Sequence, residues 1–507
     1  MRPQGAFAPI YSAAWIQDKF AFKDLILRVG VRVERYDANQ PVLNDPFGLY
    51  PMQTASEISR IKGIAVNHPD NIGGDYVVYG DNTKNQTRIL GYRKDNQWYD
   101  ANGLEIDNPE LIAKETASGQ MEPFLVDPEN DDVIPQSFKD YEPAINVLPR
   151  IWFSFPINKE AQFFANYDVL AQRPNNVFVP TSTFFFLEQL QGGTINNAAI
   201  LPRVRTNFEL GFKQQLSDNS ALSLIAAYAE TKNDFGLIRL YGAYPIEYNH
   251  TANIDFSTTK QFRLEYELRA DEDSRTSMQA NYTLLFADGT GSNINSQAAL
   301  IAANQPNLRS LYPLDVDFRH NVTATIDYRF KNGKSYTGPI VGKKGKPIFE
   351  NFGGSFIVRA RSGGPYTRNA QVTGEALEGV AQRSQILGNP FGSRLPWQFT
   401  ADMNLSKTFR IEKGNTKDKF HNPFVNLTAY LWVQNLFNQK IINSVYRFTG
   451  LPEDDGFLNS EQGQQFLQQQ IDQRQQTALV DLYNAKVQNP FNYLTPRQIR
   501  LGIRLNF

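Results

Sequence analysis

The chain has 507 residues, no cysteine and a formal net charge of -1. Disulfides and thiolate chemistry are therefore excluded. The balance of 51 Lys and Arg against 52 Asp and Glu argues against a nucleic-acid-binding protein, which would carry a basic stripe. No run of 18 apolar residues occurs, so the sequence predicts no transmembrane helix. The four histidines are far apart in the sequence, which disfavours a histidine-based metal site or triad: His68, His250, His320 and His421.

The first predicted element is a hairpin over residues 7–33. One parity of its first strand is aromatic or apolar: Phe7, Pro9, Tyr11, Ala13 and Trp15. After a turn at 21–24, apolar residues alternate with charged ones: Leu25, Leu27, Val29, Val31 and Val33 against Arg28, Arg32 and Glu34. Because successive side chains of a strand point to opposite faces, this pattern predicts two strands, each with one apolar face.

The alternation disappears between about residues 38 and 142, where Asn, Asp, Gly and Pro are frequent. A stretch of this length is too long for a plain connector, so we expect a small folded excursion. Short strands of its own are expected at 76–79 and 89–92.

Alternating strands resume at residue 145, and short and long connections follow one another in strict order. The short turns lie at about 158–160, 217–219, 271–274, 331–347 and 411–423, and the long loops at about 172–202, 228–255, 286–314, 362–396 and 437–495. The clearest strand places four apolar residues against four charged ones: Phe262, Leu264, Tyr266 and Leu268 against Arg263, Glu265, Glu267 and Arg269. If such strands cross a membrane, an Arg that faces lipid at the bilayer midplane costs roughly 2–4 kcal/mol. We therefore expect the charged residues of these strands to face a wet or plugged interior.

The last long loop contains a predicted helix at 456–487, with four residues on one helical stripe: Leu467, Ile471, Ala478 and Leu482. The chain then ends in a strand over 496–507. Its apolar parity is Ile499, Leu501, Ile503, Leu505 and Phe507, and its polar parity is Arg500, Gly502, Arg504 and Asn506.

These elements predict an all-β protein, an antiparallel transmembrane β-barrel with about 13 strands and long loops at one end. A secreted sandwich or propeller is the alternative, but its strands are usually shorter. An odd number of antiparallel strands does not close an ordinary bacterial barrel. Residues 1–5 also lack the apolar core of a signal peptide. We therefore expect either a missed strand or the C-terminal part of a longer protein.

Several short segments resemble the TonB-dependent outer-membrane receptors. The segment 433–438 (VQNLFN) is similar to a signature of their penultimate strand, and 15–19 (WIQDK) with 27–32 (LRVGVR) resembles a hairpin of the same barrels. Three loop segments resemble the Oar-like branch of Bacteroidota: 362–367 (SGGPYT), 393–397 (SRLPW) and 449–456 (TGLPEDDG).

The resemblance implies a 22-stranded barrel, an N-terminal plug and a TonB box, with energy for transport supplied through the TonB complex. About 13 of the 22 strands would be present, so the chain is expected to be the C-terminal barrel portion (1–507), with the plug and the TonB box outside it. The stretch 38–142 would be a large extracellular loop excursion, and 437–495 an extracellular loop with a helix.

Three groups of residues are candidates for local function. An acidic cluster could hold calcium, although a solvated loop is the favoured interpretation: Glu122, Asp127, Glu129, Asp131, Asp132, Asp140 and Glu142. The apolar run 183–187 could mark a ligand or partner contact, but the favoured interpretation is that it packs within the loops or extends a strand at the rim. Aromatic residues at strand ends are expected to form an interfacial girdle: Trp152, Tyr328 and Trp397.

No catalytic motif is present, so the sequence predicts no enzyme and no catalytic, cofactor-binding or metal-binding residues, and it leaves the substrate-binding residues open. The predicted function is an outer-membrane receptor or transporter that takes up a ligand into the periplasm. The expected partners are outer-membrane lipid, the TonB complex through the missing N-terminal part, and an extracellular ligand of unknown identity. The alternatives are a passive channel and a structural or adhesive outer-membrane protein in a larger assembly.

Overall fold

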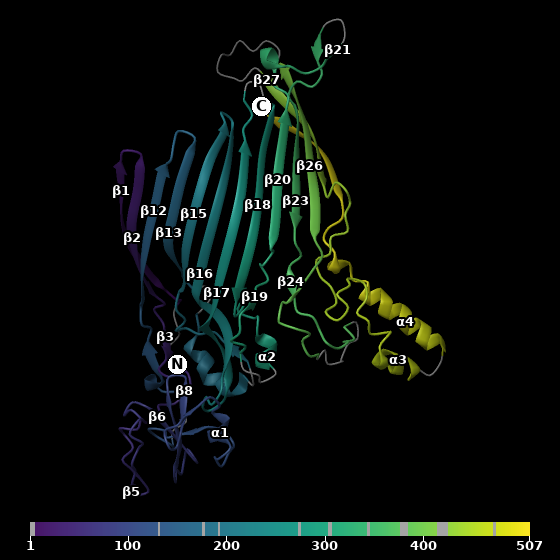
Figure 1. Ribbon diagram of the computed structural model, residues 1–507. Coiled ribbons are helices and arrows are strands. Elements are labelled where there is room, and N and C mark those ends of the chain that lie inside the picture. The colour runs from purple at the N-terminus through teal and green to yellow at the C-terminus, as the bar shows by residue number, and fades with distance from the viewer. Residues whose placement is uncertain are drawn as a thin grey trace.

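The computed structural model describes residues 6–129, 132–174, 178–190, 193–271, 275–302, 307–341, 345–375, 384–412, 424–469 and 473–506. A single curved sheet dominates it, with its strands side by side in chain order (Figure 1). The sheet has 15 strands, of which β14 and β19 lie off the main path. The other 13 follow one another as antiparallel neighbours, as the sequence predicted.

The strands of the main path are β1 (Ile10–Phe22), β2 (Leu25–Asp37), β12 (Ala144–Pro156), β13 (Ala161–Gln172), β15 (Arg203–Ser217), β16 (Ser220–Leu240), β17 (Tyr248–Leu268), β18 (Thr276–Gly289), β20 (His320–Arg329), β23 (Phe352–Arg361), β26 (Gln398–Glu412), β27 (Phe424–Gln434) and β28 (Gln498–Asn506). The tightest turns gather at one end of the sheet, and the larger excursions gather at the other (Figure 1). We call these the turn end and the loop end.

The pairing register carries the two faces of the sheet from strand to strand. Paired residues lie on the same face, and Glu265 of β17 pairs with Ser223 of β16 and Asn281 of β18. The neighbouring Leu264 pairs with Leu224 and Tyr282 on the other face. That apolar face is solvent-exposed across the sheet, for example at Val33, Val147, Phe208, Leu210, Phe262, Phe356, Phe409, Leu501 and Ile503. An exposed apolar face of this extent requires a lipid environment.

The predicted apolar face of the first strand is wrong. Tyr11 pairs with Tyr36, and its hydroxyl donates to the Glu34 carboxylate at 2.7 Å. Trp15 pairs with Arg32. Tyr11 and Trp15 therefore lie on the charged face, whereas Ile10, Ala14, Ile16, Phe20 and Phe22 share the face of the β2 valines. Both alternating sets of side chains in this strand contain apolar residues. Only the pairing with β2 therefore shows which set lies on the apolar face of the sheet.

Two further predictions are corrected by the register. Trp152 pairs with Arg28, whose guanidinium lies 5.0 Å from the Trp152 ring centre, so Trp152 is on the charged face rather than in a lipid-facing girdle. Tyr328 pairs with Gly354 on the apolar face and is 37% exposed, and Trp397 is 63% exposed.

The long loop expected at 228–255 is mostly strand, because β16 and β17 continue their pairing to Leu240 and Tyr248.

The stretch 38–142 folds into a small unit at the loop end, which we call the loop domain (Figure 1). Its sheet has the order β10-β6-β7-β8-β9. The elements of this region are β3 (Pro41–Leu43), β4 (Arg60–Ile61), β5 (Ile64–Ala65), β6 (Val77–Gly80), β7 (Ile89–Lys94), β8 (Gln97–Asp100), β9 (Glu105–Ile106), α1 (Glu110–Ala113), β10 (Glu122–Pro123), η1 (Pro135–Ser137) and β11 (Phe138–Asp140).

One buried cluster joins the loop domain to the main sheet. Phe47, Tyr79 and Trp98 of the loop domain share it with Leu240 and Tyr248, which lie at the loop end of β16 and β17. Each fully buried side chain of this kind contributes roughly 1.5–3 kcal/mol through the hydrophobic effect. The loop domain is thus built onto the extended hairpin β16/β17.

The last excursion contains two helices, α3 (Glu461–Gln468) and α4 (Gln473–Val487), instead of one continuous helix. The buried apolar side chains among their described residues are Tyr483 and Val487 of α4, which pack with Phe457. The predicted stripe is wrong at Leu482, which is 70% exposed, and at Ala478, which is also exposed. Ile471 lies outside the described residues. Among the described residues, no helix is long and apolar enough to cross a membrane.

The remaining elements are short: η2 (Thr181–Leu190), β14 (Thr194–Ile195), α2 (Ala298–Ala302), β19 (Tyr312–Pro313), η3 (Gly333–Ser335), β21 (Ile340–Val341), β22 (Lys346–Pro347), β24 (Pro365–Tyr366), β25 (Ser393–Arg394) and η4 (Pro490–Asn492).

Candidate functional site

The charged face of the sheet carries ion pairs that cross from strand to strand. Arg263 of β17 donates to the Glu209 carboxylate of β15 at 2.7 Å. Farther along the sheet, Arg359 of β23 reaches Asp402 of β26, also at 2.7 Å. Partly exposed pairs of this kind stabilise a fold by at most about 1 kcal/mol each. Their main consequence is chemical, because they make this face compatible with water or with polar protein.

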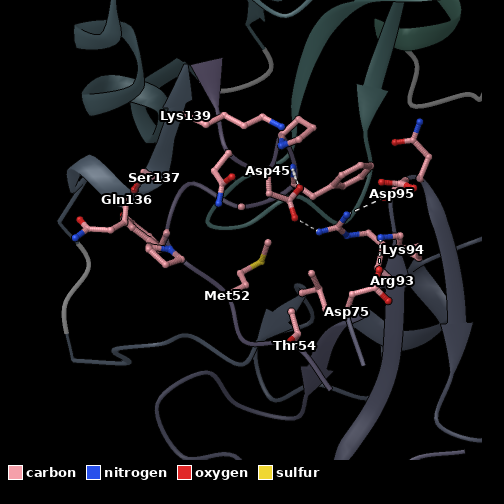
Figure 2. Close-up of a pocket in the computed structure, with 18 residues that line it drawn as sticks. Asp45, Met52, Thr54, Asp75, Arg93, Lys94, Asp95, Gln136, Ser137 and Lys139 are labelled. Carbon is pink, nitrogen blue, oxygen red and sulfur yellow. Dashed lines mark hydrogen bonds and ion pairs between the residues drawn. The ribbon is translucent and has the colours of Figure 1, made fainter. Parts of the chain in front are cut away.

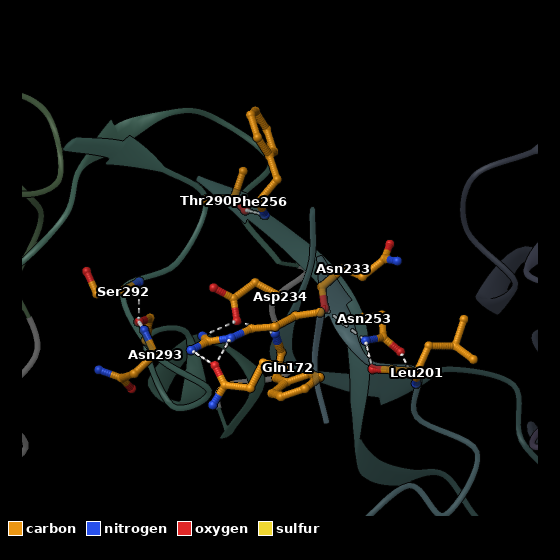
Figure 3. A network of polar contacts seen from close by, with 12 residues as sticks. Gln172, Leu201, Asn233, Asp234, Asn253, Phe256, Thr290, Ser292 and Asn293 are labelled. Atoms are coloured by element: carbon orange, nitrogen blue, oxygen red, sulfur yellow. Dashed lines mark hydrogen bonds and ion pairs between the residues drawn. The ribbon is translucent and has the colours of Figure 1, made fainter. Parts of the chain in front are cut away.

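A polar network ties the rim of the sheet together at the loop end (Figure 3). Arg203 at the start of β15 donates through Nε to the side-chain oxygen of Gln172 at 2.7 Å and through Nη1 to Asp234 at 3.2 Å. Asn253 donates to the carbonyl oxygens of Leu201 and Asn233, each at 2.9 Å. These bonds hold the loop before β15 against the β16/β17 hairpin.

The loop domain contains a cavity of about 550 Å³. This volume is within the range of about 300–1,000 Å³ that is usual for small-molecule sites. Four separate segments form its wall: 44–54, 75–77, 93–96 and 136–139. Figure 2 shows Gln136, Ser137 and Lys139 across the space from Arg93 and Lys94, with Met52 between them.

Arg93 on β7 organises one wall of this cavity. Its side chain is only 3% exposed and forms an ion pair with Asp45. Its Nε donates to the Tyr79 hydroxyl at 2.9 Å, and its Nη1 donates to the backbone oxygen of Asp95 at 2.7 Å. The guanidinium also lies 4.5 Å from the centre of the Phe47 ring. A buried charge must be paired in this way, because an unpaired one carries a large desolvation cost.

Burial also shifts the acid–base properties of two side chains at the loop end. It raises the pKa of the Tyr79 hydroxyl to about 12, although nearby Arg93 opposes the shift. It lowers the pKa of His250 to about 4. His250 lies on the loop-end side of Ser257, in the part of β17 that does not pair with β18.

The acidic cluster predicted from the sequence is spread over several elements. Glu122 accepts the backbone N–H of Thr83 at 2.9 Å, and Glu142 lies 3.5 Å from Lys139. Asp131 lies outside the described residues, whereas Asp127, Glu129, Asp132 and Asp140 are on the surface. Within the described ranges, no group of three His, Cys, Asp or Glu residues is arranged to hold a metal ion.

The apolar run 183–187 forms part of η2. Phe184 and Leu187 are buried at 5% and 2% exposure in the cluster shared with the loop domain. Phe185 and Phe186 remain 44% and 59% exposed. The run therefore packs within the loops through two of its side chains, as the sequence analysis favoured.

Sequence reasoning missed the cavity and the residues that line it. Asp45, Arg93 and Ser137 come from distant parts of a stretch without periodicity, and no motif connects them. The only available hint was the length of the stretch, which predicted a folded unit but not where its walls would meet.

A sheet with one lipid-compatible face and one charged face, with tight turns at one end and large loops at the other, defines the wall of an outer-membrane β-barrel. In sequence, the chain resembles the TonB-dependent transporter Oar of Myxococcus xanthus. The two are 28% identical over 246 residues, which are 45% of this chain and 20% of the relative. The matched region is thus a minor part of the curated relative. The chain is an outer-membrane protein similar to TonB-dependent receptors.

No protein-family model matches the sequence. Solved structures similar to the chain include the FrpB iron transporter from Neisseria meningitidis, at 9% identity and a TM-score of 0.39, covering 85% of this chain and 42% of that one. They also include the outer membrane transporter YddB from Escherichia coli, at 11% identity and a TM-score of 0.41, covering 86% of this chain and 51% of that one.

Replacing Asp45 with Ala is expected to destabilise the loop domain by about 3 kcal/mol, because it leaves the buried Arg93 charge without its carboxylate. The matched control is Asp75→Ala, which removes the partner of the more exposed Lys94 at 2.5 Å and is expected to cost at most about 1 kcal/mol. Hydrogen exchange of β6 and β7 measures both effects. Equal effects of the two substitutions would contradict the role given to Arg93.

The loop end is expected to lose stability as the pH falls from about 6.5 towards 4. Burial favours neutral His250, whose pKa drops from 6.5 to about 4 on folding. As the pH falls, His250 of the unfolded chain therefore binds its proton before His250 of the folded chain does. The resulting contribution to the free energy of unfolding, on the order of 3 kcal/mol, is present above pH 6.5 and is lost as the pH falls through the folded-state pKa. Hydrogen exchange of β16 and β17 at several pH values should show this loss in the native protein and a smaller one in His250→Asn. An unchanged pH profile in the variant argues against it.

Proposed function

We propose that the chain forms part of the wall of a TonB-dependent receptor, which takes up an extracellular ligand into the periplasm with energy from the TonB complex. The alternation of an apolar and a charged face over 13 successive strands carries this proposal. The partial similarity to Oar supports the TonB-dependent class. The assignment to the Bacteroidota branch stays a prediction.

The two edges of the sheet indicate what completes the wall. β1 and β28 are the end strands of the path, and within the described residues neither pairs with a second neighbour. Both run from the loop end to the turn end, because 13 antiparallel strands leave the first and last strands parallel. An open edge in hydrocarbon costs several kcal/mol for each unsatisfied backbone group. In this proposal an odd number of further antiparallel strands completes the barrel.

The same proposal assigns the plug and the TonB box to sequence outside this chain. The charged face would then line an interior that holds the plug. The turn end would face the periplasm and the loop domain the outside, because outer-membrane barrels have short periplasmic turns and longer extracellular loops.

Gene deletion in the source bacterium tests the transport role. Growth is compared on single carbon, nitrogen and iron sources in three strains: a deletion of this gene, a TonB-depleted strain and the combination. An active receptor predicts a growth defect on at least one source that TonB depletion reproduces and that the combination does not deepen. If the gene deletion causes the same growth defect whether TonB is active or depleted, the result favours a passive channel. If the deletion strain loses surface attachment without a growth defect, the result favours an adhesive protein.

A further inference from the structure

We infer that the folded connection between β20 and β23 binds the phosphate of an anionic phospholipid headgroup in the inner leaflet of the outer membrane. We call its described residues, 330–341 and 345–352, the turn unit. The turn unit lies at the turn end, where β21 projects beyond the main sheet (Figure 1). The choice of leaflet rests on the proposed function, in which the turn end faces the periplasm. The contact with lipid rests on the face of the sheet that the turn unit extends.

An aromatic cluster places the turn unit on the apolar face of the sheet. Tyr328 pairs with Gly354 on that face, and the Phe330 ring centre lies 5.2 Å from that of Tyr328. The ring centre of Phe349 lies 5.4 Å from that of Phe330 and 5.5 Å from that of Phe352. Phe352 is two residues before Gly354 and so lies on the same face of β23. Aromatic residues at the ends of lipid-facing strands lie at the membrane–water interface.

Lys407 of β26 is a cation in a lipid-facing row of residues. It pairs with Phe352 of β23 and with Ala429 of β27. Ala429 pairs in turn with Ile503 of β28, which is 69% exposed on the apolar face. The ammonium group of Lys407 donates to the backbone oxygen of Ile348 at 3.0 Å and to that of a second residue of the turn unit. The Lys407 side chain therefore reaches from the lipid-facing row to the turn unit.

Among the described residues, the ammonium group of Lys407 forms no ion pair with a carboxylate. On the same face near the loop end, Lys232 has the Glu230 carboxylate 3.2 Å away. A lysine on a lipid-facing surface is tolerated where its ammonium group reaches the interface and a partner there. Two backbone oxygens leave the third N–H of Lys407 and its positive charge for a ligand. The anion that a bilayer interface supplies is a lipid phosphate.

The composition of this connection favours the same ligand. Residues 331–349 contain five lysines and no Asp or Glu. In the β21/β22 hairpin, the exposed Lys346 pairs with Val341, and Ile340 and Val341 are 63% and 53% exposed. Basic residues beside exposed apolar ones are typical of segments that lie in an anionic lipid interface. A soluble anion would satisfy the lysines but would leave the apolar side chains in water.

Native mass spectrometry of the full chain in detergent measures lipid binding directly. Phosphatidylglycerol and phosphatidylcholine with the same acyl chains are added at several concentrations, and we expect phosphatidylglycerol to bind more tightly. Lys407→Gln should weaken the binding of phosphatidylglycerol about fivefold, the usual contribution of one lysine at an anionic membrane surface, and leave that of phosphatidylcholine unchanged. The control Lys213→Gln removes an exposed cation from the charged face and should bind both lipids as the native protein does.

Lys346→Gln provides a second test, because Lys346 is exposed and its loss does not threaten the fold. It is expected to weaken phosphatidylglycerol binding by a similar factor, whereas Lys407→Arg, which keeps the charge, should bind as the native protein does. Equal binding of the two lipids by the native protein, an equal loss in Lys213→Gln, or unchanged binding in both Lys407→Gln and Lys346→Gln would overturn the inference. Complete displacement of the lipid by glycerol phosphate would identify a soluble anion as the ligand and would also overturn it.

The leaflet is tested separately in whole cells, because the chain has no native cysteine. Lys346→Cys is treated with a membrane-impermeant maleimide. We expect labelling only after the outer membrane has been permeabilised. Labelling in intact cells would place the turn end outside and contradict the assignment to the inner leaflet. None of these results bears on the TonB-dependence of transport, which the growth experiment measures.

Discussion

The antiparallel register is the constraint on which the rest of this structure depends. Within a bilayer every backbone N–H and C=O must find a partner, so strands must pair continuously along their length. Pairing fixes the face of each side chain, and a slip of one residue would turn Arg263 and Glu265 towards lipid and Leu264 towards the interior. Thirteen strands keep one consistent set of faces, which explains why their apolar residues can be exposed without forming a core.

The same pairing explains where the loop domain sits. β16 and β17 run past their neighbours and bring Leu240 and Tyr248 into the cluster that also holds Phe47, Tyr79 and Trp98. The loop domain therefore packs directly against the β16/β17 hairpin. The cavity, whose walls come from four segments, lies in the loop domain that this packing holds against the hairpin. The sheet and the loop domain are thus two parts of one packed structure.

The sequence predicts the wall far better than the site. The alternation of apolar and charged residues, as at Leu264 and Glu265 or at Leu501 and Arg504, is a local pattern. It assigns the two faces of a strand without knowledge of the partner strand. It fails in β1, where both parities carry apolar residues and only pairing with Arg32 and Glu34 reveals the interior face. The helical stripe fails at Leu482 because the chain makes two helices and buries Tyr483 instead. Arg93 and Ser137 line the same cavity only through tertiary folding, which no local periodicity records.

The two faces can be measured directly because the chain has no native cysteine. Single cysteines replace Arg263, Leu264, Glu265 and Tyr266 in turn, are labelled with bimane, and the protein is reconstituted into vesicles whose lipids carry a nitroxide quencher on the acyl chain. Lipid-facing labels at Leu264 and Tyr266 should be strongly quenched, and labels at Arg263 and Glu265 should be quenched only by a water-soluble agent or remain shielded. Equal lipid quenching at all four positions, or the reverse pattern, would contradict the assignment of the sheet as a membrane wall.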